Sequence, residues 1–179
     1  MLIMTFFSVG DQEVMRKTKS AQERFRESIP ALLRWYEYNA RVLPWREDPD
    51  PYHVWISEIM LQQTRVEAVR GYYERFLSEF PTIRAVAEAP EDRLVKMWEG
   101  LGYYSRVRNI AGAAKILCER YDGALPADYE LLRGLPGIGE YTAGAIASMS
   151  FGICVPAVDG NVLRVYARLT AYRDDIRAE

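Results

Sequence analysis

Two carboxylates in contrasting surroundings are the residues of this chain best suited to chemistry. Glu58 lies in an apolar stretch, and on a helix its neighbours three and four positions away would be Val54, Trp55, Leu61 and Gln62. Burial raises the pKa of a carboxyl group, so Glu58 is predicted to hold a proton near neutral pH and to act as a general acid. A lone glutamate at the rim of a helix, reaching solvent, is the alternative.

Asp159 has the opposite setting. It directly precedes Gly160 and Asn161, where a helix is expected to begin, so it is predicted to be the N-cap. Backbone N–H groups and the helix dipole favour the charged form of such a carboxylate. A plain helix cap is the simpler interpretation, but one protonated and one ionised carboxyl group together are typical of enzymes that cleave glycosidic bonds.

A glycine-rich turn runs from Leu135 to Ala145 with the sequence Leu-Pro-Gly-Ile-Gly-Glu-Tyr-Thr-Ala-Gly-Ala. Gly137 and Gly139 can adopt positive φ and allow close backbone approach. Bare N–H groups at the start of the next helix form an anion site. Helix, glycine hairpin and helix together predict a grip on a DNA phosphate without base reading, although an ordinary helix–helix loop has the same spacing.

Composition narrows the class of protein. The 179 residues have a net charge of -2, so any DNA-binding surface must be a local patch. One histidine, His53, makes a Ser-His-Asp triad and a zinc site improbable. Cys118 and Cys154 favour free thiols in a reducing compartment, which indicates the cytoplasm, or the nucleoid of a bacterium. The apolar start, residues 1–9, is too short to cross a membrane, and we expect no membrane partner.

The elements that must position these residues are all helices. We expect an all-α fold, a partly disordered leader over residues 1–27, and one catalytic core over residues 28–179. Ser28 is the expected N-cap of the first helix, with Pro30 in its first turn. The other expected helices are 52–65, 66–80, a short one capped by Thr82, 90–100, 106–121 ending at Gly123, 128–133, 140–150 and one from 159 to about 171.

Six short motifs of the sequence occur together in one known family. Six motifs in order, between Ile29 and Ala171, resemble the adenine DNA glycosylases of the helix-hairpin-helix superfamily. They are Leu-Pro-Trp-Arg (43–46), Pro-Tyr-x-Val-Trp-x-Ser-Glu (51–58), Met-Leu-Gln-Gln-Thr (60–64), Trp-x-Gly-Leu-Gly-Tyr-Tyr (98–104), the glycine hairpin (135–145) and Asp-Gly-Asn-Val (159–162). The resemblance implies base-excision repair of double-stranded DNA in which adenine is mispaired with 8-oxoguanine or guanine.

The resemblance also implies roles for residues. Glu58 would protonate the flipped adenine, and Asp159 would face the oxocarbenium-like sugar, with Tyr141 and Asn161 around it. The adenine pocket would be lined by Trp45, Arg46 and Leu61, and DNA would be contacted by Gln63, Thr64, Tyr103, Gly137 and Gly139. Of these, Gln63 and Tyr103 would be wedges that enter the base stack, which suits planar side chains, although Tyr103 could instead be a core aromatic. A monovalent cation could bridge the hairpin and a phosphate.

One position separates two chemistries within the superfamily. The related glycosylase–lyases have a lysine two residues after the second hairpin glycine, and it forms a Schiff base. Here that position is Tyr141, so water is the expected acceptor of the sugar and the enzyme is expected to be monofunctional.

The sequence departs from the family pattern in one respect. The family continues into a four-cysteine [4Fe-4S] loop and a domain that reads 8-oxoguanine, whereas this sequence stops at Glu179. Its cysteines match no cluster spacing, so we expect no cofactor or metal in this chain. The family is monomeric, but exposure of Leu32, Leu33 and Tyr36 could cause self-association here. Two other functions stay open: a non-catalytic DNA-binding module and a mismatch thymine glycosylase.

Overall fold

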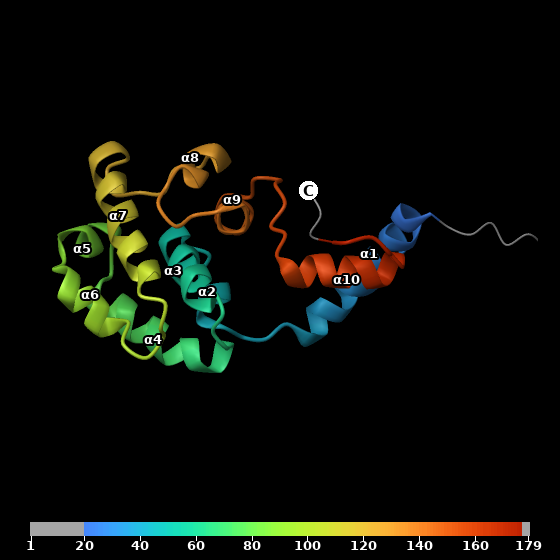
Figure 1. Ribbon diagram of the computed structural model, residues 1–179, viewed down its shortest axis with the longest axis horizontal. Helices are drawn as coiled ribbons and strands as arrows, with labels where there is room; N and C mark the ends of the chain where they lie inside the picture. The colour runs from blue at the N-terminus through green and yellow to red at the C-terminus, as the bar shows by residue number, and fades with distance from the viewer. Residues whose placement is uncertain (1–19, 177–179) are drawn as a thin grey trace, which may run out of the picture. The chain divides into compact units, whose positions relative to one another are not determined.

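The computed structural model describes residues 20–176 of the chain (Figure 1). Across this range the regular elements are helices and no strand occurs, which confirms the predicted all-α fold. The helices are α1 (Ala21–Asn39), α2 (Pro44–Glu47), α3 (Pro51–Leu61), α4 (Val66–Glu79), α5 (Ile83–Glu88), α6 (Glu91–Met97), α7 (Ser105–Arg120), α8 (Tyr129–Arg133), α9 (Glu140–Phe151) and α10 (Gly160–Thr170).

The chain divides into two compact units, where a single core over residues 28–179 was expected. One unit consists of Met1–Tyr38 and Arg164–Glu179, and the other of Asn39–Leu163. Within the first unit, α1 contacts the end of α10: the rings of Phe25 and Tyr166 meet edge to face at 5.0 Å, and the Arg24 guanidinium donates to the Thr170 carbonyl at 2.5 Å.

Helix α1 begins earlier than predicted. Its N-terminus is a capping box at Ser20, whose hydroxyl accepts from the Glu23 N–H at 3.2 Å while the Glu23 carboxylate accepts from the Ser20 N–H at 2.8 Å. Ser28 is therefore not the N-cap, and its hydroxyl instead donates to the Phe25 carbonyl. Pro30 lies inside the helix, so residues 21–27 belong to α1 and not to a leader. The rest of the predicted leader, residues 1–19, lies outside the described residues.

The expected exposure of apolar side chains on α1 is present in the structure. Leu32, Leu33 and Tyr36 are each about half exposed, with exposed fractions of 53%, 58% and 46%. This partly exposed apolar face, seen among residues 20–176, is the feature on which the prediction of self-association depends, and self-association itself stays a prediction.

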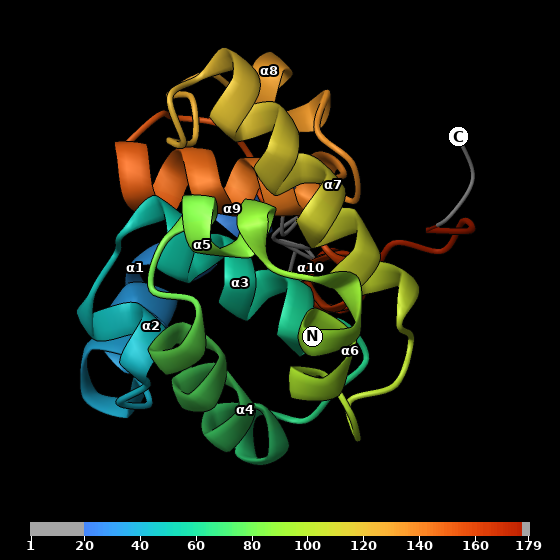
Figure 2. The same cartoon turned by 90° about the vertical axis from the view of Figure 1, so that its left-hand side faces the viewer.

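The core of the second unit is built around α3. Trp55, Ile56 and Met60 on this helix are fully buried, because α3 is apolar around most of its circumference. Helices α9 and α4 pack against α3, while α7 contacts α5 and α6 (Figures 1 and 2). A central helix with this burial gives a rigid base for the side chains that it projects.

Local capping explains where several helices begin. Asp50 caps α3 by accepting from the N–H groups of Tyr52 and His53 at 2.8 and 3.2 Å. The predicted cap at Thr82 is confirmed, since its side chain accepts from the Ala85 N–H at 3.1 Å. Asp128 caps α8 in the same way, by accepting from the Leu131 N–H at 2.9 Å. Helices α4, α8 and α9 fall within a residue or so of the predicted ranges.

Pro44 lies where no helix was predicted, and it opens the short helix α2 at the position that proline favours. Two predicted helix ends also differ from the structure. The helix expected over 52–65 ends at Leu61, since Gln63 adopts a φ of 58°. After α7, the left-handed turn begins at Asp122, with a φ of 50°, and continues through Gly123, with a φ of 74°.

Candidate active site

One cavity of the second unit contains most of the residues singled out in the sequence. Its volume is about 750 Å³, within the range of small-molecule sites. Nine predicted site residues line it: Trp45, Arg46, Glu58, Leu61, Gln63, Thr64, Tyr141, Asp159 and Asn161. Three others, Tyr103, Gly137 and Gly139, do not line it, and their expected contacts with DNA stay a prediction.

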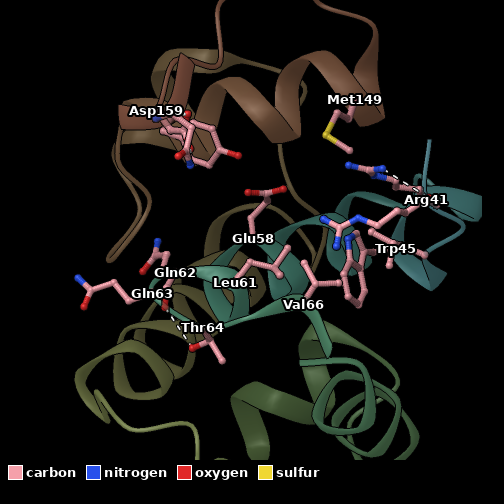
Figure 3. A pocket seen from close by; sticks show the side chains of 14 residues that line it. Arg41, Trp45, Glu58, Leu61, Gln62, Gln63, Thr64, Val66, Met149 and Asp159 are labelled. Atoms are coloured by element: carbon pink, nitrogen blue, oxygen red, sulfur yellow. Dashed lines mark hydrogen bonds between the residues drawn. The ribbon is translucent and has the colours of Figure 1, made fainter. Parts of the chain in front are cut away.

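Glu58 projects from α3 into this cavity (Figure 3). Its side chain is only 9% exposed, so the sequence-based expectation of a desolvated carboxyl is met. Burial is the main cause that raises the pKa of Glu58, and the nearby charge of Asp159 raises it further. A hydrogen bond with Tyr141 and the positive charge of Arg46 act in the opposite direction without cancelling the effect. The carboxyl group is therefore biased toward its protonated form.

Asp159 stands at the N-terminus of α10, where it was predicted to be the cap. One carboxylate oxygen accepts from the N–H groups of Asn161 and Val162 at 3.0 and 2.8 Å, and the other accepts from the Asn161 side-chain amide at 2.9 Å. Partial burial alone would raise the pKa of Asp159, but these hydrogen bonds outweigh it and lower the pKa. The carboxylate is thus held ionised.

Tyr141 lies on the first turn of α9, where its phenol forms a hydrogen bond with Glu58 and is within the electrostatic influence of Asp159. Burial raises the pKa of its phenol, as do the charge of Glu58, the hydrogen bond with Glu58 and the charge of Asp159. The phenol therefore stays protonated and available as a hydrogen-bond donor. The side chain two residues after Gly139 thus presents a hydroxyl group to the cavity, where an amine would be needed for Schiff-base chemistry.

The side chains of α2 form another wall of the cavity. Trp45 is buried, with its ring edge to face against Tyr73 at 5.2 Å, so its position is fixed by the core. Arg46 donates to the Arg41 carbonyl at 3.4 Å. Figure 3 shows Trp45 and Val66 on one side of Glu58, with Gln62 and Gln63 on the other. The cavity therefore combines an apolar wall, suited to a planar base, with polar groups around Glu58.

Two loops carry the residues expected to enter the base stack. Gln63 follows α3 and Tyr103 follows α6, and both are exposed, Tyr103 by 61%. Both also adopt a left-handed backbone, with φ of 58° and 48°. Such conformations are uncommon for residues other than glycine and occur often at functional sites. Tyr103 is therefore an exposed loop aromatic, and the alternative of a core aromatic is wrong.

The glycine hairpin has the predicted geometry at one of its two glycines. Gly137 adopts a φ of 75°, and a Cβ there would lie 2.7 Å from the Asn109 side chain. Gly139 has a φ of -86°, which any residue can adopt, and a Cβ there would meet no atom within 4 Å. Gly139 is the N-cap of α9 and has no side chain to bond the first N–H groups, so these are available to an anion.

Arg106 is a residue whose role the sequence did not predict beyond the start of a helix. Its side chain is 8% exposed and donates to carbonyls of both loops just described. A buried arginine bonded to backbone carbonyls is rare, because the charge is costly to desolvate. The available signal was its position three residues after the exposed Tyr103 and in the first turn of α7.

The cysteines do not fit an iron–sulfur cluster. Such a cluster takes four thiolate ligands, whereas these 179 residues contain two cysteines. Cys118 is partly buried on α7 and Cys154 is exposed in the loop after α9. Over residues 20–176, no three His, Cys, Asp or Glu side chains gather as a metal site would require. Within the same range, no helix combines the length and apolar character needed to cross a bilayer.

Comparisons with known proteins match most of the chain to one superfamily. The family model of the HhH-GPD superfamily of base excision DNA repair proteins matches residues 56–179. The chain is 46% identical over 138 residues to an adenine DNA glycosylase of Buchnera aphidicola, covering 76% of this chain and 39% of that protein. It is 39% identical over 180 residues to the human adenine DNA glycosylase, covering 92% of this chain and 33% of that protein.

Solved structures with the same fold include glycosylases. A thermostable thymine-DNA glycosylase matches with a TM-score of 0.77 and 26% identity, over 82% of this chain and 68% of that one. A trapped endonuclease III–DNA covalent intermediate matches with a TM-score of 0.76 and 26% identity, over 88% of this chain and 74% of that one. The chain spans between 33% and 39% of the length of the two curated relatives named above.

Proposed function

Because the chain belongs to the HhH-GPD superfamily of base excision DNA repair proteins, we propose that it hydrolyses the N-glycosidic bond of adenine in double-stranded DNA. The proposed substrate is adenine mispaired with 8-oxoguanine or guanine. The two curated relatives named above are both adenine DNA glycosylases, which supports adenine as the base. The observation that carries the proposal is the pair of Glu58 and Asp159 in one cavity, with pKa values displaced in opposite directions.

The chemistry would begin with a base outside the duplex, since a stacked adenine cannot reach a side chain buried in a cavity. Glu58 then donates its proton to adenine and makes it a neutral leaving group. The bond between the sugar C1′ and adenine breaks, and the electron pair leaves with the base. Asp159 stabilises the positive charge that develops on the sugar.

Water completes the reaction by adding to C1′. Its oxygen and one of its protons stay on the sugar as a hydroxyl group and the other proton is released, so the products are free adenine and an abasic site. Tyr141 and Asn161 would keep Asp159 and Glu58 in place through hydrogen bonds. No lysine is among the residues that line the described cavity, which supports a monofunctional enzyme.

The remaining roles concern the DNA. Gln63 and Tyr103 would fill the space left by the extruded base, because both are exposed and held on loops. Thr64 would support the first of these loops, since its N–H donates to the Leu61 carbonyl at 3.3 Å. The N–H groups beside Gly137 and Gly139 would bind a phosphate, with or without a bridging monovalent cation.

Single-turnover base release by the 179-residue chain tests the proposal. The substrates are duplexes with adenine opposite 8-oxoguanine, adenine opposite guanine and thymine opposite guanine, and a cytosine opposite 8-oxoguanine serves as the matched control. We expect adenine release from the first two and no release from the others. Release of thymine would support the mismatch thymine glycosylase, and binding without any release would support a non-catalytic DNA-binding module.

A further inference from the structure

One buried guanidinium connects the two loops that carry the proposed wedges. The side chain of Arg106 donates hydrogen bonds to five backbone carbonyls, and its two terminal nitrogens bond two different segments. Nη1 bonds the end of α3 and its loop, at Ile59 (2.8 Å), Met60 (3.2 Å) and Gln62 (2.7 Å). Nη2 bonds the turn after α6, at Leu101 (3.1 Å) and Gly102 (3.2 Å).

Two of these carbonyls lie directly before the proposed wedge residues. The Gln62 carbonyl belongs to the peptide group immediately before Gln63, and the Gly102 carbonyl to the one immediately before Tyr103. Gln63 and Tyr103 are the two residues other than glycine that adopt a left-handed backbone in these loops, with φ of 58° and 48°. A conformation that is sparsely populated persists only where its surroundings hold it. Arg106 is placed to hold both at once.

Other contacts fix Arg106 itself. Its guanidinium lies 5.5 Å from the ring centres of both Trp98 and Tyr103, and the Trp98 indole N–H donates to the same Gly102 carbonyl at 3.2 Å. Among the residues that the structure describes, no carboxylate forms an ion pair with Arg106. Its positive charge therefore interacts with the dipoles of backbone carbonyls, as expected for a residue that fixes the conformation of loops.

We propose that Arg106 is a positioning residue that locks the Gln63 loop and the Tyr103 loop together, so that both side chains enter the base stack as one rigid unit. This inference rests on the proposed function, in which those two side chains displace the adenine. A planar fork of donors can hold both loops at once, whereas the compact ammonium of a lysine cannot span the same carbonyls.

Arg106→Lys is the direct test, and Arg108→Lys is its matched control. Arg108 lies two residues further along α7, is exposed and bonds Glu91 at 2.7 Å, away from both loops. Base release is measured on two duplexes: adenine opposite 8-oxoguanine, and adenine opposite an abasic site, where the base leaves the stack at lower cost. The fluorescence of 2-aminopurine in place of the target adenine reports unstacking in parallel.

We expect Arg106→Lys to lose about 10²-fold in rate on the paired adenine, the size of loss that a slightly misplaced group causes. The rate on adenine opposite the abasic site should stay close to that of the parent, because the pocket with Glu58 is untouched. The 2-aminopurine signal should fall with Arg106→Lys and not with Arg108→Lys. Equal losses on both substrates, or no loss on either, would overturn the inference.

The two proposals fail in distinguishable ways. If the parent chain releases no adenine but still unstacks 2-aminopurine, the proposed function fails while the fluorescence comparison continues to decide the role of Arg106. If the parent does not unstack 2-aminopurine, the loops are not wedges and the inference is overturned. Should Arg106→Lys fail to fold, Arg106→Gln, which keeps two N–H donors on a planar group, is measured instead with the same comparisons.

Discussion

The buried carboxyl of Glu58 costs the fold stability whenever it ionises. Its pKa is raised by burial, so the ionised form is disfavoured in the folded state relative to the unfolded chain. Below its ordinary pKa the group is protonated in both states and the fold keeps its full stability. As pH rises through the raised pKa, that stability is lost. The burial that would make Glu58 a general acid therefore lowers the free energy of unfolding at neutral and higher pH.

Glu58→Gln should therefore stabilise the protein at neutral pH. The gain in free energy of unfolding should be small near pH 4 and larger near pH 8, by about 1.4 kcal/mol for each unit by which the pKa is raised. Urea unfolding at both pH values measures it. Glu99→Gln is the control, because the Glu99 carboxylate is exposed and its hydrogen bond with Lys96 lowers its pKa. An equal effect of Glu58→Gln at both pH values would contradict the assignment.

We expect the side chain at position 141 to determine which class of reaction follows base release. A protonated phenol cannot form a Schiff base, so borohydride treatment during the reaction should trap no covalent adduct in the segment 139–145. Peptide mass spectrometry of the treated mixture checks this. Tyr141→Lys supplies an amine at the same position and serves as the comparison. An adduct in that segment of the parent chain would show that the enzyme is a lyase.

At the scale of elements, Asp159 is positioned by close packing between α9 and the segment after it. A Cβ on Gly144 would lie 2.1 Å from the Pro156 carbonyl oxygen and 3.2 Å from the Ala157 Cα. Only glycine therefore allows the segment 155–159 to run against α9. Because this segment leads directly into Asp159, we expect the small residue on α9 to contribute to the position of the carboxylate.

Gly144→Ala should destabilise the protein by about 1–3 kcal/mol, the usual cost of overpacking, and should also slow base release. Thermal unfolding and single-turnover rates measure the two effects. Gly71→Ala on α4 is the matched control, since a Cβ there meets nothing within 4 Å and should stabilise the helix by about 0.5–1 kcal/mol. Parental stability and rate for Gly144→Ala would contradict this account of how Asp159 is held.

The hairpin offers a second comparison of two glycines. Gly139→Ala should leave stability unchanged, because the backbone is ordinary and the surrounding space is open, yet weaken DNA binding where a phosphate must approach. Gly137→Ala should also destabilise the fold by about 1 kcal/mol, because its φ is positive. Binding to matched and mismatched duplexes, with unfolding measured alongside, tests both. An affinity loss confined to mismatched DNA would place the hairpin in mismatch reading.

At the scale of the whole molecule, the sequence predicted the features that depend on residues close together in the chain. Thr82 and Asp159 cap their helices through neighbours two or three residues away, so the sequence around each was enough to predict the cap. The apolar neighbours of Glu58 likewise predicted that its side chain is buried. The capping box at Ser20 was equally local, and it was overlooked because Ser28 and Pro30 suggested a later start.

Long-range contacts set the features that sequence could not give. Helix α3 stops at Leu61, and Arg106, more than forty residues away in the chain, takes the carbonyls at its end. Division into two units also depends on packing between distant segments, here α1 and the end of α10. Neither pairing leaves a pattern of residue spacing that a single sequence reveals.

The claim at the centre of this account is that Glu58 protonates the departing base. Single-turnover adenine release by Glu58→Gln, with DNA affinity measured on the same duplex, tests it most directly. The amide cannot donate a proton as an acid, so the rate should fall by roughly 10²–10⁴-fold while affinity stays that of the parent. A variant that releases adenine at close to the parental rate would contradict the claim.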